Sequence, residues 1–206
     1  MPRRSLWPVV SLALLPALAV YMLALAWGEA AGLQPQLVVR DLALTTASPP
    51  GMGVIATLGY LLWVATAAIT LFTACARLGG VRGRERQLLI SGGVFSLLLA
   101  GDDLFQLHIR YINEGLLYGL YAVAALVLVV WFHAEIRRLD LTGFSLAVGL
   151  LGASVLIDLL PVLIPIPEPT VSLLEDGLQF LGIACWLAFW WRAAAGAVGR
   201  PRRGLC

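Results

Sequence analysis

The side chains of this sequence that could do chemistry are mostly carboxylates, and the densest group lies near the middle of the chain. That group is Asp102, Asp103, Gln106, His108 and Arg110. At about 100° per residue on a helix, Asp103, Gln106 and Arg110 share one face with Ser96, while Asp102 lies on its flank. This face could bind a cation or supply a general base. Arg110 could equally serve only to neutralise Asp102 or Asp103.

Three other segments carry comparable groups. They contain Glu114; Ser154 with Asp158; and Glu175 and Asp176 with Gln179. Oxygen-rich clusters of this kind suit calcium, magnesium or manganese. Zinc would need His108 together with two or three carboxylates, because zinc prefers nitrogen and sulfur ligands. Repulsion among so many acids favours the uptake of either a proton or a divalent cation.

The composition shows which environment must surround these acids. Of 206 residues, 60% are hydrophobic and only 13% are charged, with 14 arginines and no lysine. A soluble domain typically has about 25% charged residues. The sequence therefore predicts a protein solvated by lipid, and the apolar content and three cysteines exclude a disordered chain or a disulfide scaffold.

Six windows are long and apolar enough to cross a bilayer, which requires roughly 20 residues of helix. They are Leu6 to Trp27, Met52 to Ala76, Leu88 to His108, Gly115 to Phe132, Leu141 to Ile164 and Leu174 to Trp191. We expect an all-α, polytopic bundle in one transmembrane domain, residues 1–206, with an outer loop at 28–51. The first window exceeds the apolar run of a signal peptide, so we interpret it as a retained helix.

The arginines predict the orientation, since positive residues near helix ends stay on the cytoplasmic side. With both termini cytoplasmic, twelve arginines lie inside and only Arg40 and Arg110 lie outside. We therefore expect a multi-pass protein of the plasma (inner) membrane whose acids lie at the outer ends of the last four helices. The basic inner rim indicates no nucleic-acid partner.

The position of each acid on its helix separates structural from functional roles. Glu175 and Asp176 begin the sixth window, where carboxylates can simply cap free N–H groups. Asp102, Asp103 and Asp158 lie at carboxyl-terminal helix ends, where the helix dipole disfavours negative charge. Ionisable groups at membrane depth are costly, so these three acids need a proton, a cation or an arginine nearby.

The segment from Asp103 to His108 resembles part of the zinc site in membrane hydrolases related to alkaline ceramidases. That resemblance implies zinc held by histidines and an aspartate on several helices. The paired histidines of a late helix are absent, because the sixth window contains none. His133 lies about a membrane thickness from His108, so the two cannot share a metal or a haem. No CxxC, GxSxG, HExxH or nucleotide-binding loop is present.

These observations predict an outward-facing polar site for a divalent cation or a proton, which could be that of a metal-dependent hydrolase. The expected metal ligands are Asp102, Asp103, His108, Asp158, Glu175 and Asp176. Asp102 and Asp103 are also the candidates for a catalytic base. The alternatives are a non-catalytic membrane subunit or scaffold of a larger complex and, second, a small ion or solute transporter. The expected partners are the lipid bilayer and either another membrane protein or a second copy of the chain in a homo-oligomer. The apolar inner halves of the helices disfavour transport.

Small residues in the third, fifth and sixth windows predict close helix packing. They are Gly92, Gly93, Gly149, Gly152, Ala153 and Gly182. We expect these three helices to form the centre of the bundle, which would help to bring their acids together.

Overall fold

The computed structural model describes residues 15–32, 54–76, 78–105, 107, 111–159 and 168–199. The chain divides into two units, Met1–Met52 and Gly53–Cys206, and each is described by itself. In the first unit, α2 (Leu15–Ala30) is a helix of 16 residues. It ends at a turn in which Gly32 has φ 72°, a left-handed conformation that glycine adopts without a Cβ clash.

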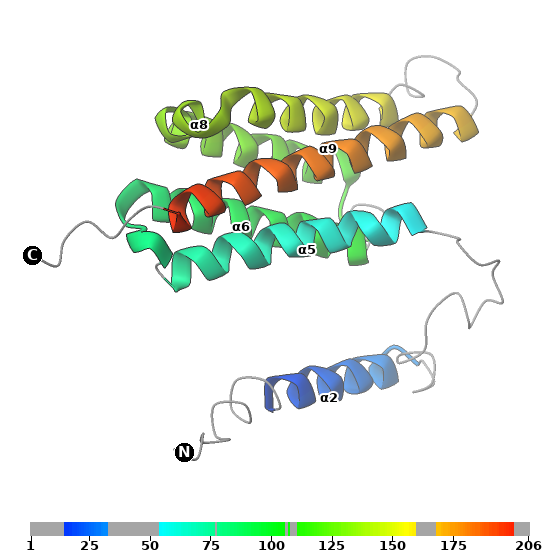
Figure 1. Ribbon diagram of the computed structural model, residues 1–206. Coiled ribbons are helices and arrows are strands. Elements are labelled where there is room, and N and C mark those ends of the chain that lie inside the picture. Colours follow the sequence, from blue (N-terminus) through cyan, green and yellow to red (C-terminus); the bar gives the residue numbers. More distant parts are fainter. Residues whose placement is uncertain are drawn as a thin grey trace, which may run out of the picture. The chain divides into compact units, whose positions relative to one another are not determined.

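The second unit is a bundle of long helices (Figure 1). Its elements are α5 (Val54–Cys75), the short 3₁₀ helix η2 (Leu78–Gly80), α6 (Gly83–Phe105), α8 (Glu114–Asp158) and α9 (Glu168–Val198). α5, α6, α8 and α9 are long and apolar enough to cross a membrane. The predicted all-helical architecture is confirmed for the described residues, and these four helices are compatible with a multi-pass protein in a lipid bilayer. The count of six crossings and the orientation stay predictions.

The 45 residues of α8 form two arms that fold back on each other. A straight helix of that length would span about 66 Å. Instead, the Tyr118 hydroxyl donates a hydrogen bond of 3.1 Å to the Asp158 carboxylate at the other end of α8. The two arms appear in Figure 1 as the green and the olive-to-yellow parts of α8. α8 therefore corresponds in position to the fourth and fifth predicted windows.

The reversal in α8 occurs at Asp140, where φ is −171° and ψ is 89°. Asp140 Oδ1 accepts the backbone N–H of Gly143 at 2.9 Å, which is the bond that an N-cap residue makes to the first turn of a helix. Asp140 thus begins the second arm. This position agrees with the predicted start of the fifth window at Leu141.

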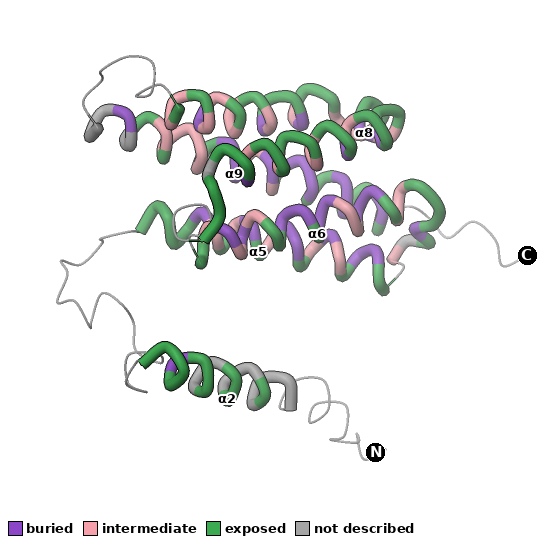
Figure 2. Tube along the Cα trace, turned by 180° about the vertical axis from the view of Figure 1, so that it is seen from behind, coloured by how far each residue is buried: buried purple, intermediate pink, exposed green. Residues whose placement is uncertain are grey.

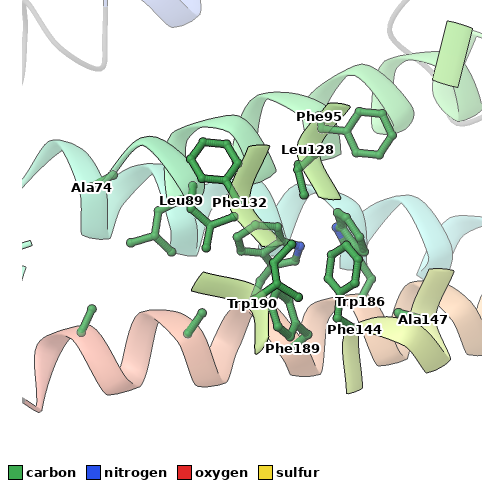
Figure 3. Packing of buried hydrophobic residues seen from close by; sticks show 14 of the residues in the cluster. Ala74, Leu89, Phe95, Leu128, Phe132, Phe144, Ala147, Trp186, Phe189 and Trp190 are labelled. Carbon is green, nitrogen blue, oxygen red and sulfur yellow. The ribbon is translucent and has the colours of Figure 1, made fainter. Parts of the chain in front are cut away.

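Aromatic residues of α9 fill the centre of the bundle (Figure 3). Trp186, Phe189 and Trp190 are each at most 2% exposed. Trp186 lies edge-on to Trp63 of α5 and Phe95 of α6 and is tilted against Phe144 of α8. The buried residues, purple in Figure 2, lie on the faces that these helices turn toward one another. In lipid, such packing stabilises the bundle mainly through van der Waals contact.

α6 and α9 are antiparallel, and three pairs of residues define their register. Gly92 lies against Trp190, Ser96 bonds to Trp186, and Asp103 bonds to Gln179. Along α6 these residues are four and then seven positions apart, and their partners on α9 are four and then seven positions apart in the opposite direction. A Cβ on Gly92 would lie 2.2 Å from the Trp190 ring, so this approach requires glycine.

Two of the predicted packing positions on α8 do not make close contacts. Gly182 lies against Leu151, as expected for a site of helix approach. Gly149 and Gly152 are exposed, and a Cβ at either would meet nothing within 4 Å. The centre of the bundle also includes α5, which packs closely on α6 and α9. The prediction from small residues is therefore correct for α6 and α9 and wrong for Gly149 and Gly152.

At the arginine-rich end of the bundle, ion pairs hold the helices together. Arg84 Nε of α6 lies 2.9 Å from Glu135 of α8, and Arg192 of α9 pairs with Asp140. Arg86 donates to the carbonyl of Ala74 at 3.1 Å, which satisfies an acceptor near the end of α5. Two of the carboxylates expected on this side thus have arginine partners.

Candidate functional site

The last turn of α6 presents two adjacent carboxylates to different neighbours. Asp102 is only 4% exposed, and it lies close to the Tyr121 hydroxyl on the first arm of α8. Asp103 Oδ2 accepts the indole N–H of Trp63 on α5 at 2.9 Å. Its Oδ1 lies 3.4 Å from the amide nitrogen of Gln179 on α9. We call these five residues, together with Tyr118 and Asp158, the acidic site.

Asp158 enters the acidic site from the far end of α8. It is the last residue of the second arm, and the Tyr118 hydroxyl donates to its Oδ2. Tyr118 and Tyr121 are three residues apart, so they lie on the same face of the first arm. Consequently Asp158 bonds to one of two neighbouring tyrosines, and Asp102 lies close to the other. Ser154, one turn before Asp158, is also buried.

An aromatic layer lies beneath these acids. Trp63 lies edge-on to Trp186 at 6.2 Å, and Phe95 lies edge-on to Tyr121 at 6.4 Å. Ser96 is part of this layer, because its hydroxyl accepts the Trp186 indole N–H at 2.9 Å and donates to the Gly92 carbonyl. Farther from the acids, the described core is a cluster of aromatic and aliphatic side chains. The site is therefore one-sided in the described bundle.

The structure describes two of the four residues on the predicted polar face of α6, Ser96 and Asp103. Ser96 and Asp103 both bond to residues of α9, so they share a face as expected. They do not share a partner, because about 10 Å of helix separates them. Gln106, His108 and Arg110 lie outside the described residues.

The remaining predicted acids take different positions. Glu175 is half-buried and Asp176 is exposed. α9 begins at Glu168, so both lie about two turns inside the helix, and the expected capping role does not apply to them. Glu114 begins α8, and its side chain lies outside the described residues.

The predicted metal ligands can be compared with the structure only in part. Within the described ranges, no group of three histidine, cysteine, aspartate or glutamate residues could hold a metal ion. The physical reason is the spacing of the two central acids, since adjacent residues project about 100° apart on a helix. Asp102 consequently faces α8 while Asp103 faces α5 and α9. The predicted ligand His108 is not among the described residues.

Sequence reasoning missed Trp63, which binds Asp103, and Trp186, which binds Ser96. A signal for both was available. A tryptophan in the middle of an apolar span usually has a partner for its indole N–H, because lipid offers none, although Trp190 Nε1 has none among the described residues. Tyr118 and Tyr121 were visible as an i, i+3 pair, although their spacing alone is also typical of residues at a membrane interface.

A family model for a domain of unknown function, DUF8692, matches residues 10–193 of the chain. The chain belongs to this family. The DUF8692 match includes every residue of the acidic site, from Trp63 to Gln179. No curated protein and no solved structure matches the chain.

Proposed function

We propose that this DUF8692 protein is a multi-pass protein of the plasma (inner) membrane whose acidic site takes up and releases a proton on the extracytoplasmic side. The observation that carries the proposal is the hydrogen bond of 3.1 Å from the Tyr118 hydroxyl to the Asp158 carboxylate, and the buried Asp102 lies close to a second tyrosine, Tyr121. Such pairs, placed at the end of a membrane helix, can accept a proton without losing their hydrogen bond.

The chemistry of the partners explains why. An ionised carboxylate only accepts hydrogen bonds, whereas a protonated carboxyl group also donates one. A tyrosine hydroxyl can do both, so the bond between Tyr118 and Asp158 can reverse its direction when the acid is protonated. Trp63 can only donate, and its bond to Asp103 stabilises the ionised form of that acid. Asp102 and Asp158 are thus assigned as the proton carriers and Asp103 as the fixed anion.

The aromatic layer supports a one-sided role. Trp63, Phe95, Tyr121 and Trp186 lie in edge-to-face contact between the acids and the apolar core. A proton that reaches Asp102 therefore leaves by the side from which it came. This arrangement favours local acid–base chemistry at the membrane surface over transport through the bundle.

The test is infrared spectroscopy of the full-length protein in lipid nanodiscs as the pH is lowered. A protonated carboxyl group has a carbonyl stretching band that the ionised form lacks. We expect this band to appear in the wild type and to be weaker in Asp102→Asn and in Asp158→Asn. Asp176→Asn is the matched control, since Asp176 is an exposed acid of the same bundle. Tyr118→Phe keeps Asp158 but removes its hydrogen-bond donor, so the band should shift in frequency.

Two results would contradict the proton assignment. One is a pH-dependent band that is as strong in both site variants as in the wild type. The other comes from titration with magnesium, calcium, manganese or zinc ions. Stoichiometric binding that is lost in Asp102→Asn would show that the site holds a metal ion, as the hydrolase hypothesis requires.

A further inference from the structure

A groove runs between α6 and the first arm of α8, and Phe95, which contacts Tyr121, belongs to its lining. Its volume is about 580 Å³. It begins near Gln87 and Ser91, continues along Val94 and Leu98, and has Ala124, Val127, Leu128, Trp131 and Phe132 as its opposite wall. The groove exists because α6 packs closely on α5 but only loosely on α8.

The length of the groove matches one leaflet of a bilayer. From Gln87 to Leu98 the axis of α6 rises about 16 Å, at 1.5 Å per residue. The hydrocarbon core of a bilayer is about 30 Å thick, so one leaflet is about 15 Å deep. The groove is too small for a helix, since a cylinder 10 Å wide and 16 Å long encloses about 1,200 Å³. A single extended hydrocarbon chain is the occupant that fits this shape.

The mouth of the groove carries positive charge. The adjoining segments 82–87 of α6 and 131–138 of α8 contain five arginines and two glutamates. Arg82 is exposed, and Arg84 is 60% exposed while it pairs with Glu135 and donates to the Trp131 carbonyl. Trp131 is itself exposed at this end, as is typical of tryptophans at a membrane interface.

We infer that the groove binds one anionic phospholipid from the leaflet on the arginine-rich side. The acyl chain lies along Val94 and Leu98, and the phosphate lies against Arg82 and Arg84, whose guanidinium groups match its geometry. The phosphate is assigned to the arginine-rich end of α6, so this inference does not require that Asp102 takes up a proton.

Native mass spectrometry of the full-length protein tests the inference, after incubation with phosphatidylglycerol or with phosphatidylcholine. Val94→Trp fills the groove, and Val64→Trp is its matched control. The two valines are 46% and 48% exposed, and Val64 lies on α5 outside the groove. We expect the wild type and Val64→Trp to retain one phosphatidylglycerol, with at least tenfold weaker binding in Val94→Trp. If Val94→Trp does not fold, Leu98→Trp fills the same groove.

Three outcomes would overturn the inference. Equal lipid binding by Val94→Trp and Val64→Trp would show that the lipid lies elsewhere. Equal retention of phosphatidylcholine would remove the role of the arginines. A wild-type dimer that dissociates only in Val94→Trp would show that a second copy of the chain covers this face. Weaker phosphatidylglycerol binding in Arg82→Gln, with unchanged melting temperature, would support the assigned position of the phosphate.

Discussion

At the scale of single residues, hydrogen-bond partners distinguish the two ends of the bundle. At the arginine-rich end, Glu135 and Asp140 pair with arginines. At the other end, the described donors to Asp103 and Asp158 are an indole, an amide and a phenol. A hydrogen bond from a positively charged donor stabilises an ionised carboxylate more strongly than a hydrogen bond from a neutral donor does. The described donors to the carboxylates therefore differ in charge between the two ends of the bundle.

The contribution of the Trp63 indole can be measured by Trp63→Phe. The substitution removes the donor to Asp103 and retains an aromatic ring, so the free energy of unfolding should fall by about 1–2 kcal/mol. Trp191→Phe is the control, since Trp191 is 59% exposed. Unfolding by a denaturing detergent gives both values. Equal stability of the two variants would contradict a structural role for the bond.

The amino-acid sequence predicts which acids matter better than it predicts what they bind. Helix position identified Asp102, Asp103 and Asp158 as unfavourably placed charges, and all three accept or share hydrogen bonds in the structure. A periodic pattern cannot show whether two neighbouring acids converge on one ligand. That depends on the partners across the bundle, and Trp63 and Tyr121 draw the two carboxylates apart.

At the scale of helices, the register between α6 and α9 depends on one glycine. Gly92 leaves space for the Trp190 ring, and this contact aligns Ser96 with Trp186 and Asp103 with Gln179. Ser96 and Asp103 are seven residues apart on α6, and their partners Trp186 and Gln179 are seven residues apart on α9. The geometry of the acidic site is therefore set partly by packing at the opposite end of the same helix pair.

Gly92→Ala should destabilise the bundle by about 1–3 kcal/mol, because the new methyl group overlaps the Trp190 ring. Gly149→Ala is the control, since a Cβ there meets nothing within 4 Å and alanine has the higher helix propensity. Thermal unfolding in detergent measures both. Adding Trp190→Leu should recover part of the loss. Full stability of Gly92→Ala alone would mean that the helices do not approach in this register.

The two arms of α8 meet at a capped turn that can be tested separately. Asp140→Ala removes the cap on Gly143 and the pair with Arg192, and should lower the free energy of unfolding by about 1–2 kcal/mol. Asp140→Asn keeps a capping side chain and loses only the ion pair, which should cost less than about 1 kcal/mol. If the two variants are equally unstable, the ion pair and not the cap determines the stability of the turn.

At the scale of the whole molecule, hydropathy predicts the positions of the helices more reliably than it predicts how two successive helices are joined. The break at Asp140 falls at the predicted boundary, yet the arms continue as one nearly unbroken helical segment. No proline separates them, and the charged residues Glu135, Arg137, Arg138 and Asp140 indicate a short turn. The reversal becomes visible when Tyr118 and Asp158 are seen to touch.

Labelling of single cysteines tests the hairpin and the orientation together, after Cys75, Cys185 and Cys206 have been replaced by alanine. Gly115→Cys and Leu159→Cys introduce exposed thiols at the two ends of α8, and Arg138→Cys introduces one at its turn. Because the arms fold back, a maleimide that cannot cross membranes should label positions 115 and 159 from one side and position 138 from the other. The arginine distribution predicts that position 138 is cytoplasmic and reacts only in inverted vesicles. Labelling of 115 and 159 from opposite sides would require a straight α8 about 66 Å long, and would contradict both the hairpin and the shared site of Tyr118 and Asp158.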